Sequence, residues 1–459
     1  MNKEQIAETV ARQRSFFATG ATLDVNYRIA ALKKLRKALQ DNEEAIAEAL
    51  GQDLGKSAME GYMCETGLVI SEISYMLRHI RRFAKEQTVV TPLAQFHSHS
   101  YRKPCPYGVT LIMSPWNYPL LLTLDPLADA LAAGNTAVIK PSAYSPATSA
   151  LLQKLIADIF PPEYVTVVLG GREENSALLE EKFDYIFFTG SKNVGRTVLE
   201  KAAVHLTPAT LELGGKSPCI IHRSADLKLA AKRIVFGKYL NCGQTCVAPD
   251  YILCDRSVKD RFLEYLKEEI AAQYGTDYLH NESYGKIISE KHFRRVAGLI
   301  DPEKVSVGGR SDAASLKIEP TVMDNVTWED AVMGEEIFGP VLPILTFDCV
   351  EEVIKTVAAH DKPLALYIFA SDKKVIRAVT SRCAYGGGCV NDCVIHLATS
   401  AMGFGGVGES GMGSYHGKTG FATFTHYKSI LDKKTWLDLP MRYQPYKKLY
   451  DTLIHMFLR

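Results

Sequence analysis

The 459-residue sequence has almost no net charge and no long hydrophobic run. Its 53 Lys and Arg against 52 Asp and Glu leave a formal charge of +1, which argues against nucleic acid or anionic lipid as a partner, because both require a basic surface. The longest apolar stretch, residues 119–133, is interrupted by Asp125 and Asp129 and is shorter than a membrane span. We therefore expect a protein without an integral membrane anchor.

A secretory signal and metal-type cysteine spacing are also missing. The N-terminus, MNKEQIAETVARQRSFF, is polar and helix-like, with no apolar segment of signal-peptide length. None of the ten cysteines forms a Cys-x-x-Cys pair, and Cys242/Cys246 and Cys389/Cys393 have no His partner at zinc-finger spacing. We expect reduced thiols in a cytoplasmic protein, and no structural metal.

Short apolar runs alternate with helical segments from residue 109 onward. The runs predict strands at 109–113, 136–140, 165–169, 184–189 and 209–213, and the helical segments between them lie near 119–133, 145–159, 173–181 and 194–205. Strands that alternate with helices predict a parallel sheet covered on both faces. Ligands of such sheets bind at the carboxyl ends of the strands.

Other parts of the chain are less regular. Residues 26–50 have helical spacing with Gly51 as a stop, and a second helical stretch covers 58–84. The polar, β-rich segment 83–108 predicts a projecting hairpin. The second half predicts helices at 225–238 and 258–272 and strands near 342–347 and 364–369. The mixture favours two α/β lobes.

Two glycine motifs are candidates for a phosphate site. Gly403-x-Gly405-x-x-Gly408 satisfies the dinucleotide pattern literally, but neither a strand before it nor a helix after it is predicted, so we interpret it as a close-packing loop. Gly190-Ser191 instead lies between a strand and a helix, where free amides can receive a phosphate. Glu212 follows Gly190 by 22 residues, a spacing that would suit a ribose-binding acid.

The segment YLNCGQTCVAPDY (239–251) holds two cysteines four residues apart. They can be interpreted as metal ligands, as a buried pair without chemistry, or as one nucleophile and a bystander. The spacing alone leaves these interpretations open.

Seven motifs, in order, resemble the aldehyde dehydrogenase superfamily, and most closely its class 3 branch, over nearly the whole chain. They are PWNYP (115–119), IKPS (139–142), FTGS (188–191), LELGGKSP (211–218), NCGQTCVAPDY (241–251), EEIFGP (335–340) and FGGVGESGMGSYHGK (404–418). The resemblance implies an α/β fold with a Rossmann-like cofactor domain, a second α/β catalytic domain and a small bridging β-hairpin. The implied divisions are 1–82 with 105–211 for the cofactor, 212–410 for catalysis, 83–104 with 421–435 for bridging, and 436–459 as a C-terminal tail.

The same resemblance assigns the catalytic residues. Cys246 becomes the nucleophile and Cys242 a bystander. A thiol is intrinsically nucleophilic and needs only modest activation. The oxyanion that forms on attack is stabilised by the Asn117 side-chain amide and the backbone N–H of Cys246. Glu212 becomes the general base for thioester hydrolysis, which overrides its ribose interpretation.

Cofactor contacts also follow from the resemblance. Glu336 takes the ribose role, Phe338 packs beside the nicotinamide, Lys140 binds the adenosine ribose, and Gly190 with Ser191 and the following helix hold the pyrophosphate. The full expected set is Ile112, Met113, Ser114, Pro115, Trp116, Lys140, Ser142, Ala143, Thr189, Gly190, Ser191, Val194, Gly195, Leu213, Gly214, Glu336 and Phe338.

The function implied is oxidation of medium-chain aliphatic or aromatic aldehydes to carboxylic acids with NAD or NADP, by a homodimer. The alternatives are a CoA-acylating dehydrogenase, which generally lacks the base glutamate, and a non-catalytic relative, which would have lost Cys246 or Glu212. The sequence departs from the family at Gly403, at Glu409 and at Ala143, which replaces a frequent Glu. No motif covers the expected substrate-pocket positions Tyr62, Met63 and 394–401.

Overall fold

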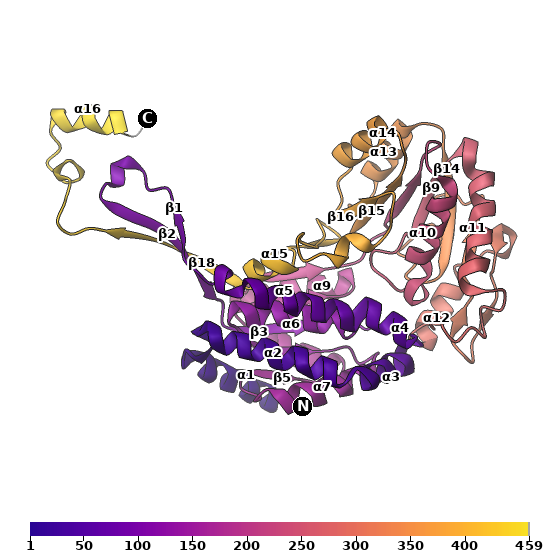
Figure 1. Cartoon of the computed structure of the whole chain (residues 1–459), viewed down its shortest axis with the longest axis horizontal. Coiled ribbons are helices and arrows are strands. Elements are labelled where there is room, and N and C mark those ends of the chain that lie inside the picture. Colours follow the sequence, from indigo (N-terminus) through magenta and orange to yellow (C-terminus); the bar gives the residue numbers. More distant parts are fainter. Residues whose placement is uncertain (458–459) are drawn as a thin grey trace.

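A computed structural model describes residues 1–457 and shows two α/β lobes from which a β-hairpin projects (Figure 1). The first lobe contains helices α1 (Lys3–Ala18), α2 (Val25–Asp41), α3 (Glu43–Leu54), α4 (Ala58–Gly61), α5 (Gly67–Phe83), α6 (Leu121–Ala133), α7 (Pro146–Ile159), α8 (Arg172–Glu180), α9 (Lys192–His205) and α15 (Gly417–Thr423). Its strands are β3 (Val109–Met113), β4 (Thr136–Lys140), β5 (Val165–Val167), β6 (Tyr185–Thr189), β7 (Ala209–Glu212) and β17 (Gly411–Met412).

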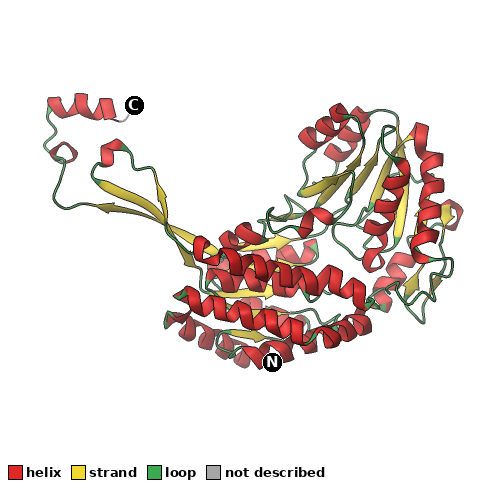
Figure 2. Ribbon diagram, in the orientation of Figure 1, coloured by secondary structure: helices red, strands yellow, loops and turns green. Residues whose placement is uncertain are grey.

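The sheet of the first lobe has the strand order β17-β7-β6-β3-β4-β5. The strands from β3 to β7 are parallel to one another, and β3, β4 and β6 are buried along their whole length, as a sheet covered by helices on both faces requires (Figure 2). The chain continues from β3 outward to β5 and then returns to β6 beside β3. This reversal of strand order is the point where such sheets bind ligands.

The second lobe is built on a seven-stranded sheet of the order β10-β13-β14-β9-β8-β15-β16. Its strands are β8 (Pro218–Ile221), β9 (Tyr251–Asp255), β10 (Val305–Val307), β13 (Thr321–Met323), β14 (Val341–Phe347), β15 (Ala365–Phe369) and β16 (Gly387–Val390), with the small pair β11 (Ser311–Asp312) and β12 (Lys317–Ile318) beside it. The helices are α10 (Leu227–Tyr239), α11 (Lys259–Tyr274), α12 (Glu290–Ala297), α13 (Val350–Ala359) and α14 (Lys373–Arg382).

The projecting element is a three-stranded antiparallel sheet, in which the hairpin β1 (Gln87–Val89) and β2 (Ser98–Pro106) pairs with β18 (Thr425–Lys433). The chain ends with α16 (Lys448–Phe457) near the tip of this sheet (Figure 1). Within residues 1–457, no helix combines the length and the apolar character that a membrane crossing requires.

Three expected boundaries are wrong. Residues 26–50 are two helices, because Asn42 leaves the helical conformation (φ −121°, ψ 24°) between α2 and α3. Gly51 does not stop α3, which continues to Leu54 and ends at Gly55 in the left-handed region (φ 67°); an interior glycine costs a helix only about 1 kcal/mol. The expected strand 421–435 begins later, at Thr425, because α15 occupies residues 417–423.

The glycine-rich loop 403–417 is a close-packing loop, as expected. Its strand β17 pairs with β7, with Gly411 opposite Glu212, and Leu213 N–H donates to Ser410 O at 3.1 Å. A Cβ on Gly406 would lie 2.2 Å from the Ser410 carbonyl oxygen, so only glycine allows this approach. The loop thus lies beside the strand that ends in Glu212 and pairs with it at the edge of the sheet.

Candidate functional site

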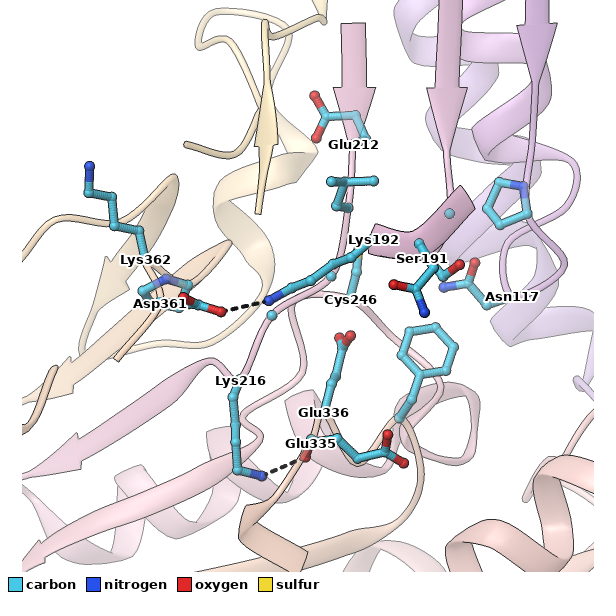
Figure 3. Close-up of a pocket in the computed structure, with 18 of the residues that line it drawn as sticks. Asn117, Ser191, Lys192, Glu212, Lys216, Cys246, Glu335, Glu336, Asp361 and Lys362 are labelled. Carbon is cyan, nitrogen blue, oxygen red and sulfur yellow. Dashed lines mark hydrogen bonds and ion pairs between the residues drawn. The ribbon is translucent and has the colours of Figure 1, made fainter. Parts of the chain in front are cut away.

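Two cavities meet at Cys246. The large cavity, about 590 Å³, lies at the carboxyl ends of β3, β6 and β7 and is closed on its other side by residues of the second lobe (Figure 3). The narrow cavity, about 210 Å³, is lined mainly by apolar side chains of α5, α6, α10 and the 394–400 loop. Leu122 and Cys246 line both cavities, so the thiol lies where the contents of the two cavities would meet.

The loop that carries Cys246 is held by its own polar groups. After α10, Asn241 and Cys242 adopt left-handed conformations (φ 52° and 54°), which turn the chain back on itself. The Gln244 side-chain amide donates to the carbonyl oxygens of Asn241 and Lys286, both at 3.0 Å, and accepts from Ile288 N–H at 3.0 Å. These bonds fix the backbone that presents Cys246.

The two cysteines of this loop have different surroundings. Cys242 is fully buried, and its thiol donates to the Tyr284 hydroxyl at 3.4 Å. Cys246 is partly exposed and lines the cavities. Burial, together with the nearby Glu336 and Glu212 carboxylates, raises the pKa of the Cys246 thiol to about 12. The thiol is therefore protonated at neutral pH and needs a proton acceptor before it attacks.

Glu212 is the last residue of β7 and lines the large cavity. It is 2% exposed, and neither carboxylate oxygen has a hydrogen-bond partner among the described residues. Burial raises the pKa of Glu212 well above its ordinary value. A carboxyl in this environment is a stronger base than one in water.

Asn117 is held from both sides in the segment after β3. Its side-chain amide donates to Gln244 O at 3.0 Å, which ties it to the cysteine loop. Its backbone carbonyl accepts from Lys56 Nζ at 2.9 Å and from the Asn241 amide at 2.7 Å. An amide N–H held in this way is preorganised to stabilise an oxyanion.

Lys56 and Glu65 form a buried ion pair behind Asn117. Their side chains are 0% exposed and 2.6 Å apart, and the second Glu65 oxygen accepts from the backbone N–H groups of Leu120 and Leu121 at 2.8 and 3.2 Å, at the start of α6. Sequence reasoning missed both residues, because no motif includes them and nine positions separate them.

We expect Lys56→Met to destabilise the protein by about 3–5 kcal/mol, because it leaves the Glu65 charge buried without a partner. The measurement is the free energy of unfolding in urea, with Lys37→Met as the matched control. Lys37 pairs with Asp41 on the surface, where an ion pair contributes about 1 kcal/mol or less. Equal effects of the two substitutions would contradict this role of the buried pair.

The phosphate-binding interpretation fits the geometry of α9. Ser191 is its N-cap residue but makes no side-chain capping bond, so first-turn amides remain free for an anion. Thr189 Oγ1 is buried without a partner among the described residues. A Cβ on Gly214 would lie 1.9 Å from a Glu336 carboxylate oxygen. Only glycine therefore allows the Glu336 side chain to approach the backbone so closely at this position. The residues present suit a dinucleotide.

The second lobe supplies the opposite wall. Burial, together with the Asp250 charge, raises the pKa of Glu336 to about 8, although a hydrogen bond from the Gly215 amide opposes the shift. The Phe338 ring stands edge-on to Trp116, with centroids 5.3 Å apart. Arg295 fastens this segment by donating to the carbonyl oxygens of Glu336 and Ile337 at 3.3 and 2.5 Å. The two lobes thus face each other across the large cavity.

The predicted site residues divide into two groups. Those that line the large cavity are Pro115, Trp116, Asn117, Thr189, Gly190, Ser191, Glu212, Leu213, Gly214, Cys246, Glu336 and Phe338. Those that do not line it are Ile112, Met113, Ser114, Lys140, Ser142, Ala143, Val194 and Gly195. Lys140 is buried, and its ammonium donates to the carbonyl oxygens of Pro141 and Gly170 at 2.8 and 2.7 Å, so it is already occupied within the protein.

Further lining residues were not predicted. They are charged or aromatic side chains from both lobes, namely Lys192, Arg196, Lys216, His292, Arg295, Trp328, Glu335, His360, Asp361 and Lys362. Lys192 and Arg196 stand four residues apart at the start of a helix after a Gly-Ser turn, a signal the sequence contains. Met63 and residues 394–400 contribute to the narrow cavity, whereas Tyr62 is exposed and does not line it.

Comparisons with known proteins agree on one family. The sequence model described as "Aldehyde dehydrogenase family" matches residues 1–430. The chain is 45% identical over 436 residues to 4,4'-diaponeurosporen-aldehyde dehydrogenase of Staphylococcus aureus, covering 95% of both chains. It is 42% identical over 444 residues to the dimeric NADP-preferring aldehyde dehydrogenase of the dog, covering 96% of this chain and 98% of the relative. A solved structure of Staphylococcus aureus AldH in a substrate-bound state superposes with a TM-score of 0.97 at 43% identity, covering 98% of this chain and 99% of that one.

Proposed function

The chain belongs to the aldehyde dehydrogenase family, and on this premise we propose that Cys246 is the nucleophile, Glu212 the general base and Asn117 the oxyanion donor of its reaction. The enzyme oxidises aldehydes to carboxylic acids with NAD or NADP. The observation that carries the proposal is the position of Cys246, which is shared by a polar cavity of dinucleotide type and a largely apolar one.

The first half of the reaction forms a covalent adduct. The Cys246 thiol gives up its proton to water, and the thiolate attacks the aldehyde carbon to give a thiohemiacetal. The developing oxyanion accepts hydrogen bonds from the Asn117 amide and the Cys246 backbone N–H. A bound nicotinamide supplies the hydride acceptor that turns this adduct into a thioester.

The second half releases the acid. Glu212 removes a proton from water, the resulting hydroxide attacks the thioester carbon, and the tetrahedral adduct expels the Cys246 thiolate and the carboxylic acid. Burial raises the pKa of this carboxyl, which makes it a stronger base for this step than an ordinary carboxylate. Oxidation of a panel of aldehydes by the purified protein, followed as NAD(P)H absorbance, tests the function.

The substrates we propose are medium-chain aliphatic and aromatic aldehydes, because the narrow cavity is lined mainly by apolar side chains such as Leu68, Phe236 and Ile395. The Staphylococcus aureus relative is named for 4,4'-diaponeurosporen-aldehyde. The CoA-acylating alternative is disfavoured by the presence of Glu212, and acceleration of turnover by added CoA would support it. The non-catalytic alternative is disfavoured because both Cys246 and Glu212 are present.

We expect the enzyme to use NADP as well as NAD. Ala143 lies in an exposed position just beyond β4, where a glutamate in relatives attracts the 2′-hydroxyl of NAD and repels the 2′-phosphate of NADP. A like-charge contact near a surface costs on the order of 1–4 kcal/mol, so its absence shifts the preference by about tenfold or more. The measurement is kcat/KM for both cofactors in the wild type and in Ala143→Glu. Negligible NADP activity in the wild type, or no swing toward NAD in the variant, would assign the choice to other residues.

A homodimer in the cytoplasm completes the proposal. The dog and rat relatives are named dimeric, and the projecting sheet exposes apolar side chains, Val90, Leu93, Phe96 and Leu431 among them. Light scattering of the purified protein tests the dimer. Ten free cysteines are consistent with a reducing compartment.

A further inference from the structure

The narrow cavity carries a polar patch on an otherwise apolar wall. Ser71 and Glu72 on α5, Asp125 on α6, and Ser400 and His416 near α15 line this part of it. Neither the proposed nucleophile nor the proposed base is among them. Burial of a polar group without a hydrogen-bond partner costs free energy. A ligand with polar groups would supply such partners to the patch.

Asp125 is the residue of the patch that lacks a complete set of partners. It is 1% exposed and lines the cavity. Its Oδ2 lies 3.4 Å from His416 Nδ1, whereas Oδ1 is buried with no hydrogen-bond partner in residues 1–457. On α6 it stands three and four residues after Leu122 and Leu121, on the same face of the helix. Leu122 lines both cavities together with Cys246, so Asp125 lies one turn of α6 from a residue that the two cavities share.

The charge states of this pair decide which ligand it suits. Burial raises the pKa of Asp125 well above its ordinary value, and the Glu72 charge raises it further, while burial lowers the pKa of His416 to about 4. The raised pKa of Asp125 favours its protonated form, and the lowered pKa of His416 favours the neutral imidazole. A neutral carboxyl donates one hydrogen bond and accepts others. This capacity matches a hydroxyl group, which also donates and accepts.

The neighbouring acids differ from Asp125: Glu72 has a hydrogen-bond partner, whereas both oxygens of Asp129 also lack one among the described residues, but Asp129 does not line the cavity. Glu72 accepts from Gly417 N–H at 2.7 Å and so holds the start of α15. Asp129, one turn beyond Asp125, does not line the narrow cavity and lies under Gly420, where a Cβ would be 1.8 Å from its Oδ2. Asp125 is thus the acid of this group whose buried, unpartnered oxygen belongs to the cavity wall.

We propose that Asp125, backed by His416, is a specificity-determining residue that binds a hydroxyl group on the tail or ring of the aldehyde. This inference rests on the proposed function, because it assigns the narrow cavity to the aldehyde. Aldehydes that carry a carboxylate at the same point are poor substrates, because the Glu72 carboxylate lines the same part of the cavity and opposes a further negative charge there. The substrate class is therefore hydroxylated aldehydes, in addition to plain apolar ones.

The test compares two aldehydes of nearly equal shape, 4-(hydroxymethyl)benzaldehyde and 4-ethylbenzaldehyde, which differ by a hydroxyl in place of a methyl group. In a purely apolar cavity the buried hydroxyl lowers kcat/KM by about tenfold or more. We expect the wild-type ratio of kcat/KM, hydroxymethyl over ethyl, to be one or higher. Asp125→Leu is expected to lower this ratio about tenfold, and Asp125→Asn, which keeps a donor and an acceptor, to retain most of it.

Asp129→Asn is the matched control, because it changes a buried acid one turn away on the same helix that does not line the cavity. It is expected to leave the ratio unchanged. A wild-type ratio below about one tenth, or an unchanged ratio in Asp125→Leu, would overturn the inference. If Asp125→Leu does not fold, the inference is tested by the wild-type ratio and by the ratio in Asp125→Asn. Turnover of 4-ethylbenzaldehyde without any effect of Asp125 contradicts this inference alone. Absence of turnover with both aldehydes contradicts the proposed function and this inference with it.

Discussion

Replacement of Cys246 by alanine abolishes aldehyde oxidation, with an expected loss of at least about 10⁴-fold in kcat, the scale on which removal of a covalent nucleophile acts. The reason is that no acyl intermediate can form without the thiol at the meeting point of the two cavities. The measurement is steady-state NADH production with a saturating aromatic aldehyde. Cofactor binding, followed by quenching of intrinsic fluorescence, should persist in the variant.

Cys242→Ala is the matched control, because it removes a thiol four residues away in the same loop. Cys242 is fully buried against Tyr284, so the substitution is expected to reduce stability and to leave most of the turnover. A similar loss of turnover in both folded variants would mean that the loop as a whole, and not one nucleophile, carries the activity.

Glu212→Gln is expected to slow steady-state turnover about 10²- to 10⁴-fold, the usual contribution of a positioned base. The amide keeps the shape of the side chain but cannot accept the proton of the attacking water. Because the thioester still forms, rapid mixing should show a burst of NADH of about one equivalent per active site, followed by a slow phase. Glu212 lies in a buried position without partners among the described residues, so the exchange breaks no hydrogen bond that the structure contains.

The pH dependence gives a second measurement on the same pair of proteins. Glu212 is active as a base only when it is deprotonated, and burial raises its pKa, so wild-type deacylation increases with pH over a range that lies above the ordinary range of a carboxyl. The slow phase of Glu212→Gln should lack this dependence on the carboxyl. If the variant instead showed weakened cofactor binding with normal turnover at saturating NAD, Glu212 would be assigned to the ribose.

The elements of the first lobe were accessible from the sequence because their signals are local. The strands of the parallel sheet are short apolar runs, and the helices between them have amphipathic spacing, so both appear within a dozen residues. The expected strands at 109–113 and 136–140 coincide with β3 and β4. Helix boundaries were less certain, as Asn42 and Gly51 show, because a break depends on the packing of the helices and not only on the residue at the break.

The sequence also determined the chemical inventory of the site. The motifs and their order predict that Cys246, Glu212, Asn117 and Glu336 belong to the site. The reason is that a reaction of this type needs those groups at the ends of particular strands and loops. At Glu212 the spacing of residues alone favours a ribose-binding acid, whereas the set of motifs favours a general base. The assignment of Glu212 as the general base depends on recognising the whole set of motifs together, and it stays a prediction.

Only the tertiary structure decided how these groups are held and what surrounds them. The Lys56–Glu65 ion pair behind Asn117, the bond from Asn117 to Gln244 and the meeting of two cavities at Cys246 join residues that are distant in the sequence. The same holds for Asp125 and His416, which lie 3.4 Å apart although almost 300 residues separate them. Burial sets the proton affinity of these groups, and burial is a property of the packed chain that no local pattern of residues expresses.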